Sequence, residues 1–463
     1  MIRIFRHYIS RAYLSLLLIE FVVFFSAMYF GITAPVLTAA SWYSDYGIIV
    51  SSTVFGCVLT LSCAAMGLYR RSLSLQDYNL LARTCVSFVL AVIILALIYY
   101  FIPEFLIGRS VLAVAIFFAL VGIFITRELF YKFANLEKFK KRVLVIGSGT
   151  KASKLSDINN SFIHKSFKIV GFVSFPGEQV AVDELLVNYY ENNDIRAVAE
   201  GLKADELVVA LDDNRRFMPL NGLLDCKMSG LKVIDMVSFY EREQGIISLE
   251  NTYPGWLIFS DGFAQGGLRA WEKRLFDLFA SSLLLVVTWP VMLLATLAIF
   301  LESGGNGTIF YRQIRVGEDG RNFEVLKFRS MRNDAEKNGV QWAQAKDSRV
   351  TAVGGVIRKF RIDELPQIFN VFSGQMSFVG PRPERPEFVN GFEERIPYYR
   401  ERHRVKPGIT GWAQLCYPYG ASEDDTIQKL QYDLYYVKNY SLFLDISIMF
   451  NTVEVVLWGK GAR

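Results

Sequence analysis

The chain has 463 residues, of which 52% are apolar and only 21% are charged, and its formal net charge is +5. This composition excludes an intrinsically disordered protein and argues against a purely soluble enzyme. Five scattered cysteines without a Cys-x-x-Cys pair, and only three histidines, argue against a disulfide framework, a structural zinc site or a histidine-rich metal centre. The modest positive charge suits a membrane surface or anionic substrates better than nucleic acid, so we expect no nucleic-acid partner.

Four long apolar runs fill the first 130 residues, at 13–32, 47–68, 86–102 and 111–125. A membrane crossing requires about 20 mostly apolar residues. Three runs reach or approach that length, and the fourth extends into its flanks. A cleaved signal peptide is the alternative for the first run, but three more runs follow it and no clear cleavage site is present. We therefore predict a four-helix transmembrane domain at 1–135.

Basic residues are distributed unevenly around these runs. They precede the first run, lie between the second and third, and follow the fourth, whereas the other two loops contain only Arg109. Loops rich in lysine and arginine stay in the cytoplasm. The pattern therefore predicts that the N-terminus and all residues after 127 are cytoplasmic.

Residues 140–262 have the pattern of an α/β domain. Short apolar segments at 142–147, 169–175, 195–199, 207–211 and 231–236 are predicted to be strands, with helical segments between some of them. Alternating strands and helices favour a parallel sheet.

The first of these strands leads into a G-x-G-x-x-A turn that contains Gly147 and Gly149. Such a turn allows backbone amides to approach a pyrophosphate at a helix N-terminus. No acidic residue ends the second predicted strand, where a ribose would be bound, and Glu178 lies beyond Pro176 and Gly177. We expect a Rossmann-like domain that regulates the protein or contacts a second copy. A dinucleotide-binding domain is the alternative.

Residues 275–301 form a 27-residue apolar run with one charge, Asp277. Trp289 and Pro290 lie at its centre, and proline removes a helical hydrogen bond. Basic residues flank both ends. The residues alone leave two readings open: a proline-kinked spanning helix, or a helix that enters the membrane and returns.

The following region is basic, with twelve basic and six acidic residues between 312 and 361. This excess indicates a solvated face, a patch for anionic lipid headgroups, or a phosphate-binding surface. Residues 323–331 alternate like a strand and are predicted to present Lys327 and Arg329 on one face.

Two adjacent carboxylates, Asp363 and Glu364, follow this basic region. They suit Mg²⁺ binding or nucleophilic attack on phosphorus, although acidic residues also favour a helix start. Residues 380–386 and 406–412 form two rigid turns, and the first fixes Arg382. Residues 442–458 form an amphipathic segment, either on the membrane or facing the core.

Five motifs occur in order: YRQIRVG (311–317), KFRSM (327–331), IDELPQ (362–367), MSFVGPRPE (376–384) and KPGITGWAQ (406–414). Together they resemble the bacterial sugar transferases, which are polyprenyl-phosphate glycosyl-1-phosphate transferases of the large monotopic phosphoglycosyl transferase type. The resemblance covers 268–463, and the segments at 417–422 and 429–436 resemble the exopolysaccharide branch.

This resemblance implies a three-part fold class: a four-helix transmembrane bundle at 1–135, a Rossmann-like α/β domain at 140–262, and a monotopic α/β catalytic domain at 268–463. It also implies that helix 275–301 is re-entrant and breaks at Trp289 and Pro290. The implied location is the bacterial inner membrane, with the catalytic domain facing the cytoplasm. Membrane lipids and a second copy of the chain, in a homodimer, are expected partners.

The resemblance further implies the chemistry. Asp363 would attack a UDP-sugar, release UMP and pass the sugar phosphate to polyprenyl (undecaprenyl) phosphate. Glu364 would bind Mg²⁺ with Asp363, or activate the acceptor. The implied substrate and phosphate ligands are Lys327, Arg329, Arg358, Arg382, Arg315 and Gln367. Glucose and galactose are the sugars expected from the family, and a membrane-anchored NAD-type or sugar-nucleotide-binding regulatory protein is the alternative function.

Overall fold

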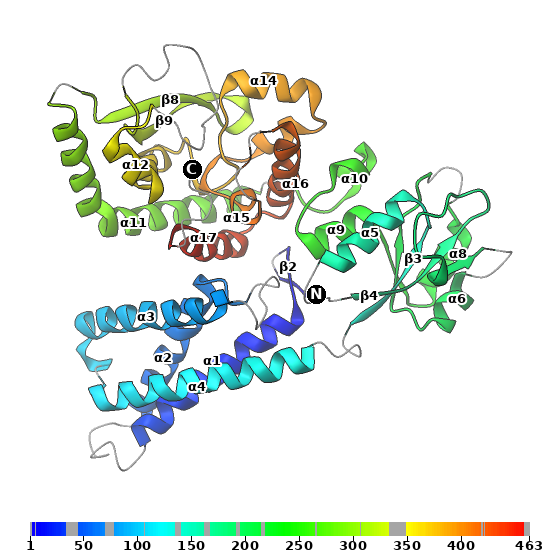
Figure 1. Cartoon of the computed structure of the whole chain (residues 1–463), viewed down its shortest axis with the longest axis horizontal. Helices are drawn as coiled ribbons and strands as arrows, with labels where there is room; N and C mark the ends of the chain where they lie inside the picture. The colour runs from blue at the N-terminus through cyan, green and yellow to red at the C-terminus, as the bar shows by residue number, and fades with distance from the viewer. Residues whose placement is uncertain are drawn as a thin grey trace. The chain divides into compact units, whose positions relative to one another are not determined.

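We describe a computed structural model of the chain (Figure 1). The description covers residues 2–4, 6–33, 45–69, 78–105, 107–134, 140–161, 167–190, 195–213, 218–263, 266–305, 307–332, 349–417, 420 and 422–457. The chain contacts define two units. One comprises Met1–Ile2 and Tyr8–Glu243, and the other comprises Arg3–His7 and Gln244–Arg463.

The N-terminal region begins with a short hairpin and continues as four long apolar helices. The hairpin strands are β1 Ile2–Ile4 and β2 His7–Ile9, and the helices are α1 Arg11–Thr33, α2 Asp45–Ala65, α3 Tyr78–Phe101 and α4 Arg109–Ala134. Each of these helices is long and apolar enough to cross a membrane, as the sequence predicted.

A buried ion pair joins the first and last of these helices. Glu20 of α1 accepts a 2.8 Å hydrogen bond from Nε of Arg127 on α4, and the two side chains are 0% and 1% exposed. The hydroxyl of Tyr69 also donates to Glu20, at 2.7 Å. The one acidic residue in the four apolar runs is therefore paired and not exposed to lipid.

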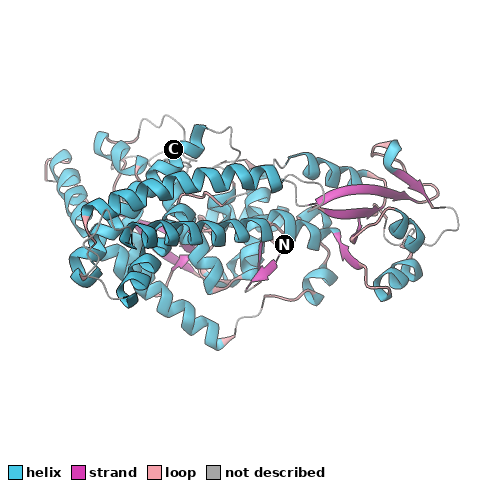
Figure 2. Cartoon of the chain, turned by 90° about the horizontal axis from the view of Figure 1, so that it is seen from below, coloured by secondary structure: helices cyan, strands magenta, loops and turns pink. Residues whose placement is uncertain are grey.

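The Rossmann-like part contains a five-stranded parallel sheet with the order β5-β4-β3-β6-β7. Its strands are β3 Lys141–Ile146, β4 Phe167–Ser174, β5 Val187–Tyr189, β6 Glu206–Val209 and β7 Lys232–Asp235. The associated helices are α5 Thr150–Ser161, α6 Ile195–Gly201, α8 Leu220–Met228 and α9 Met236–Gln244. Figure 2 shows these strands together with helices around them. Numbered along the chain, this order is 3-2-1-4-5, which matches the first five strands of the Rossmann order 3-2-1-4-5-6.

One predicted strand is wrong. Residues 195–199 belong to helix α6, because Ile195, Val198, Ala199 and Leu202 repeat at helical spacing and pack into the core beside the sheet. The fifth strand of the sheet is β5, which the sequence analysis did not identify. The other four predicted strands are confirmed, with small shifts at their ends.

The C-terminal unit is mostly helical, with two pairs of short strands. β8 Phe310–Val316 and β9 Asn322–Phe328 pair antiparallel, and β10 Ser377–Val379 and β11 Gly408–Thr410 pair parallel. Its α-helices are α10 Pro254–Phe259, α11 Gly267–Glu302, α12 Ala352–Lys359, α13 Ile368–Phe372, α14 Pro386–Arg395, α15 Trp412–Cys416, α16 Glu423–Asn439 and α17 Leu442–Leu457. Its short 3-10 turns are η5 Leu249–Asn251, η6 Glu318–Gly320, η7 Ile362–Gln367 and η8 Tyr399–Arg404.

The segment from Gln244 to Phe263 belongs to this C-terminal unit, whereas the sequence predicted that residues up to 262 end the Rossmann-like domain. Its backbone is the reason: the amide of Ile247 donates to the carbonyl of Gln431 at 3.0 Å, and the amide of Phe263 to the carbonyl of Lys438 at 3.3 Å. Both acceptors belong to α16.

Helix α11 contains the apolar run with the central proline. It is helical throughout its 36 residues, with Pro290 inside it, and Figure 1 shows it bent along its length. Near the bend, the Thr288 hydroxyl donates to the carbonyl of Leu284 at 2.7 Å. Many apolar side chains of α11 are exposed, including Leu275 at 71% and Leu294 at 66%.

Both ends of α11 are attached to helices that flank η7. Near its start, Arg274 donates 2.6 Å and 2.7 Å hydrogen bonds to the carbonyls of Val371 and Phe372 on α13. At its end, the Glu302 carboxylate accepts a 3.0 Å hydrogen bond from the amide of Val353 on α12. A straight helix of this length would separate its ends by about 54 Å, so the bend allows both attachments.

Helix α17 faces the core of the C-terminal unit, which supports the second of the two alternatives for residues 442–458. Leu444, Asp445 and Ile448 are each 0% exposed. Asp445 accepts hydrogen bonds of 2.7 Å from Lys273 of α11 and from the hydroxyl of Tyr436 on α16.

Candidate active site

The two adjacent carboxylates lie on the short turn η7 between α12 and α13. Arg361 precedes this turn in a left-handed backbone conformation (φ 55°), which redirects the chain after α12. Ile362 and Leu365 pack against the apolar core cluster that contains Ile299 and Phe328. Because these apolar side chains fix η7, the backbone positions of Asp363 and Glu364 between them are fixed as well.

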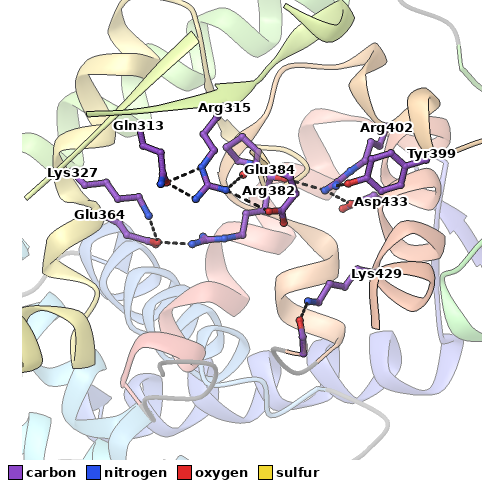
Figure 3. A network of polar contacts seen from close by, with 12 residues as sticks. Gln313, Arg315, Lys327, Glu364, Arg382, Glu384, Tyr399, Arg402, Lys429 and Asp433 are labelled. Carbon is purple, nitrogen blue, oxygen red and sulfur yellow. Dashed lines mark hydrogen bonds and ion pairs between the residues drawn. The ribbon is translucent and has the colours of Figure 1, made fainter. Parts of the chain in front are cut away.

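Glu364 is at the centre of a cluster of cations (Figure 3). Its Oε1 accepts a 2.8 Å hydrogen bond from Nη2 of Arg382 and lies 3.3 Å from Nζ of Lys327. Its Oε2 lies 3.6 Å from Nη1 of Arg361. Burial alone would raise the pKa of Glu364, but Arg382, Lys327 and Arg361 lower it far below its usual value. Glu364 is therefore ionised at any physiological pH.

Asp363 has the opposite electrostatic environment from its neighbour. Burial and the adjacent Glu364 carboxylate raise the pKa of Asp363 to about 6, while Lys327, Arg358 and Arg382 act against this rise. Near neutral pH this carboxylate is ionised but more basic than an ordinary aspartate. That combination suits a nucleophile, because basicity favours attack on an electrophilic phosphorus.

The turn that carries Arg382 is held by close backbone contacts. The amide of Gly380 donates to the carbonyl of Thr410, and the amide of Gly408 donates to the carbonyl of Pro381, both at 2.9 Å. A Cβ atom at Gly380 or Gly408 would overlap the backbone of the other segment. Glycine is therefore required at both positions for the two motif loops to meet.

Arg315 of β8 also contacts this turn, and Figure 3 shows it with Gln313 and Glu384. Its Nη1 donates to the carbonyl of Pro383 at 3.1 Å and lies 3.4 Å from Oε2 of Glu384. Its Nε and Nη2 donate to Oε1 of Gln313, at 3.0 Å and 2.6 Å. The Arg315 guanidinium thus bonds to Gln313 and to the turn itself, and these contacts hold the turn in place.

A buried network behind the turn was missed by the sequence analysis. Arg402 donates to the hydroxyl of Tyr399 at 2.7 Å and to the carbonyl of Arg382 at 2.9 Å, and it pairs with Asp433 at 2.7 Å. Burial raises the pKa of Asp433 to about 6, against the opposing effect of Arg402. No spacing rule joins residues 402 and 433, although the second lies in the 429–436 segment already noted.

The structure brings several of the predicted phosphate ligands close to the two carboxylates. Lys327 and Arg382 reach Glu364, and the charge of Arg358 acts on Asp363. Arg329 follows the last residue of β9, and its guanidinium lies close to Gly307. Gln367 is buried at the end of η7, with 4% of its surface exposed. The catalytic and ligand roles of these residues remain predictions.

The predicted Mg²⁺ site would use the same two carboxylates. Within the described ranges, no three His, Cys, Asp or Glu side chains cluster as a self-contained metal site. Mg²⁺ typically binds through one or two carboxylates together with substrate phosphates and water. The donor set of Asp363 and Glu364 fits that shared type of site, although Lys327 and Arg382 already engage one Glu364 oxygen.

The glycine turn of the Rossmann-like part is occupied by the chain's own carboxylate. Asp212, which follows β6, accepts hydrogen bonds from the amides of Thr150 and Lys151 at 2.9 Å and from the Thr150 hydroxyl at 2.7 Å. These amides begin α5, where a Rossmann domain binds pyrophosphate. A Cβ at Gly149 would overlap the Asp212 carboxylate. Asp212 therefore fills the phosphate position, and backbone hydrogen bonds contribute to its lowered pKa despite the opposing effect of burial.

Known proteins similar to this chain belong to the family that the five motifs predicted. A family model described as "Bacterial sugar transferase" matches residues 268–459. The UDP-N-acetylgalactosamine-undecaprenyl-phosphate N-acetylgalactosaminephosphotransferase of Aeromonas hydrophila is 42% identical over 241 residues, which cover 52% of this chain and 56% of that protein. The UDP-glucose:undecaprenyl-phosphate glucose-1-phosphate transferase of Xanthomonas campestris pv. campestris is 32% identical over 339 residues, covering 70% of this chain and 68% of that protein.

A third relative is shorter than this chain and is matched over almost its whole length. The exopolysaccharide production protein PSS of Rhizobium leguminosarum bv. phaseoli is 39% identical over 196 residues, which cover 41% of this chain and 97% of that protein. This chain thus spans nearly all of the Rhizobium protein, but only a little over half of the Aeromonas protein's length. With these matches the resemblance is confirmed, and the chain belongs to the bacterial sugar transferase family.

Proposed function

We propose that this protein transfers a sugar 1-phosphate from a UDP-sugar to polyprenyl phosphate and releases UMP, as a membrane step of exopolysaccharide or related glycan synthesis. The observation that carries the proposal is the contrast between Asp363 and Glu364. One carboxylate is more basic than usual, and its neighbour is held as an anion by three cations. The activities for which the relatives are named support the substrate classes.

In the first step, Asp363 acts as the nucleophile. One carboxylate oxygen attacks the β-phosphorus, which carries the sugar, and the bond from this phosphorus to the bridging oxygen breaks. UMP leaves with that oxygen and its electron pair, and the sugar phosphate stays on Asp363 as an acyl phosphate. The pKa of about 6 keeps Asp363 ionised at neutral pH without making it a poor nucleophile.

In the second step, an oxygen of polyprenyl phosphate attacks the same phosphorus and the Asp363 carboxylate leaves. The product is polyprenyl diphosphate sugar, and Asp363 returns to its starting state. Both steps gather negative charge on phosphate oxygens, so positioned cations are the main catalytic requirement. Lys327 and Arg382 are close enough to Glu364 to serve both as its partners and as phosphate ligands.

Asp363 and Glu364 would hold Mg²⁺ together with substrate oxygens, and the ion would supply charge neutralisation at the diphosphate. In the absence of substrate, Glu364 keeps Lys327 and Arg382 together. We infer that the incoming diphosphate takes over part of these contacts, so that the cations need little rearrangement.

We further propose that α11 is re-entrant and that the catalytic region faces the cytoplasm of the inner membrane. Its attachment to α13 at one end and α12 at the other supports this topology, because both helices flank η7. Pro290 has no amide to donate to the preceding turn, which favours a bend. The exposed apolar side chains of α11 would then contact lipid.

The alternative function, a NAD-type or sugar-nucleotide sensor at the glycine turn, is less well supported, because Asp212 occupies the phosphate position. The sugar is proposed only as a class. Relatives are named for glucose and for N-acetylgalactosamine, and galactose was expected from the family.

The test uses the full chain in detergent with polyprenyl phosphate, Mg²⁺ and a panel of UDP-glucose, UDP-galactose and UDP-N-acetylgalactosamine. We expect UMP and a lipid-linked sugar diphosphate from at least one donor. UDP in place of UMP would indicate an ordinary glycosyltransferase and contradict the proposal. Trapping of radioactive sugar phosphate on wild-type protein, but not on Asp363→Asn, tests the covalent step.

Topology is tested by single cysteines at Ala270 and Ser303 in a chain without its native cysteines. Intact cells are treated with a membrane-impermeant thiol reagent. Protection of both positions supports the re-entrant helix with a cytoplasmic catalytic region, whereas labelling at Ser303 alone would show that α11 crosses.

A further inference from the structure

An aromatic cluster lies beside the two motif loops that position Arg382. Trp412, the first residue of α15, stacks on Tyr435 of α16 with 5.9 Å between ring centroids. Two segments from outside the family match at 268–459 complete this cluster. One is the N-terminal stretch before α1, and the other is the segment that follows α9.

The N-terminal stretch contributes His7. Its ring meets Trp412 edge to face, with 5.5 Å between centroids, and its Nδ1 lies 2.9 Å from the hydroxyl of Tyr435. Phe443 of α17 lies on another side, at 6.4 Å between centroids. Burial lowers the pKa of His7 to about 4, so the ring is neutral at physiological pH and suits an aromatic environment.

The segment after α9 contributes the backbone of Gly245. The indole Nε1 of Trp412 donates to the carbonyl of Gly245 at 2.9 Å. Gly245 has a positive φ of 67°, and a Cβ there would lie 3.1 Å from Cζ2 of Trp412. A side chain at this position would therefore strain the backbone and crowd the indole. The next residues are attached to α16, where the amides of Ile247 and Leu249 both donate to Gln431.

Trp412 is connected to the active site by a short path of backbone contacts. It lies two residues after Thr410, whose carbonyl accepts the amide of Gly380 at 2.9 Å. Gly380 lies two residues before Arg382, which donates to Glu364 at 2.8 Å. A displacement of Trp412 would thus move β11, and with it the turn that carries Arg382.

From this arrangement we infer that His7 and Gly245 are positioning residues for the transfer reaction. They fix Trp412, and thereby the Arg382 turn, although both lie outside the region that defines the family. The effect on turnover rests on the proposed function, whereas the docking of His7 on Trp412 does not. In this chain the catalytic unit is therefore completed by one residue that precedes the first long apolar helix and one that follows α9.

The test compares His7→Ala, His7→Phe and Gly245→Val in the full chain, with Ser10→Ala, between His7 and α1, as the matched control. The contact of His7 with Trp412 is measured by the ¹⁹F NMR spectrum of the chain labelled with 5-fluorotryptophan. The Trp412→Phe variant identifies the resonance of Trp412, because that resonance is missing from its spectrum. We expect His7→Ala and Gly245→Val to shift that resonance, and Ser10→Ala to leave it in place. An unmoved resonance in His7→Ala would refute the docking.

Positioning is read from kinetics and from binding of UDP by calorimetry. His7→Ala should raise KM for the UDP-sugar by about fivefold, with a smaller change in kcat, because the affected cation contacts the diphosphate. The His7→Phe variant keeps an aromatic ring, so its KM for the UDP-sugar should be close to that of the wild type. A shifted resonance with unchanged KM and UDP affinity would show docking without positioning and overturn the inference. If no UDP-sugar is turned over by the wild type, the proposed function fails, and the resonance and UDP titration still decide this inference.

Discussion

Replacing Asp363 by asparagine should abolish turnover and make the fold more stable. The substitution keeps the shape of the side chain and removes its charge. In the folded chain the pKa of Asp363 rises from 3.8 to about 6. Each pKa unit corresponds to about 1.4 kcal/mol, so ionised Asp363 destabilises the native state by up to about 3 kcal/mol at pH 7. Asparagine removes this cost together with the nucleophile.

The pH dependence has a defined sign. Because the pKa of Asp363 is raised in the folded state, protonated Asp363 stabilises the fold. This contribution to stability is fully present below pH 3.8 and is lost as the pH rises through about 6. Turnover should change in the opposite direction and increase through the same range, as the nucleophile ionises. Asp363→Asn should show a flatter stability profile between these pH values.

Glu364→Gln is the matched control, because it changes the adjacent carboxylate in the same way. The pKa of Glu364 is lowered in the folded state, which therefore favours the anion. Glutamine at this position would leave Lys327 and Arg382 close together without the carboxylate that they share. We expect a loss of stability of about 3 kcal/mol. Both variants should lose activity, but their stability changes should have opposite signs.

The assay is thermal unfolding in detergent at pH 5, 6, 7 and 8, combined with UMP release under the same conditions. Substantial turnover by well-folded Asp363→Asn would refute the nucleophile assignment. A lower melting temperature for Asp363→Asn than for wild type at pH 7 would refute the electrostatic reasoning, even if turnover were lost.

Four further predictions concern other parts of the chain. Arg382→Lys keeps the charge but loses the planar fork, and kcat/KM should fall by about tenfold or more in the UMP assay; an unchanged value would remove Arg382 from the site. Asp212→Asn should destabilise the Rossmann-like part by about 1 kcal/mol with normal turnover, whereas Asp157→Asn, at an exposed position on α5, should leave its stability unchanged; loss of turnover in Asp212→Asn would indicate a ligand role for Asp212. Pro290→Leu should straighten α11, lower activity and increase thiol labelling of a cysteine at Ser303, and unaltered labelling and activity would contradict the bend. Removal of divalent ions with EDTA should abolish UMP release and Mg²⁺ should restore it, so full activity in EDTA would exclude a metal requirement.

Local sequence was sufficient for features that depend on composition and on short motifs. The four apolar N-terminal helices follow from the length of the runs, since no other structure suits such segments in lipid. Strands such as β3 and β6 follow from short buried apolar segments. Asp363 and Glu364 lie next to each other in the fold because they are consecutive in the sequence. The ordered motifs identified the family, because each combines turn residues and charges at fixed spacing.

Tertiary structure decided which distant groups meet and which of two local conformations forms. Residues 195–199 suit a strand by composition, but packing beside the sheet selects helix α6. Lys327 and Glu364 are 37 residues apart in the sequence, and the fold brings the Lys327 Nζ to 3.3 Å from the Glu364 carboxylate. Arg402 and Asp433, and likewise His7 and Trp412, are far apart in sequence, so only the fold brings them together. The opposite pKa shifts of two adjacent carboxylates have the same origin, because burial and the positions of surrounding cations are set by residues far away in the chain.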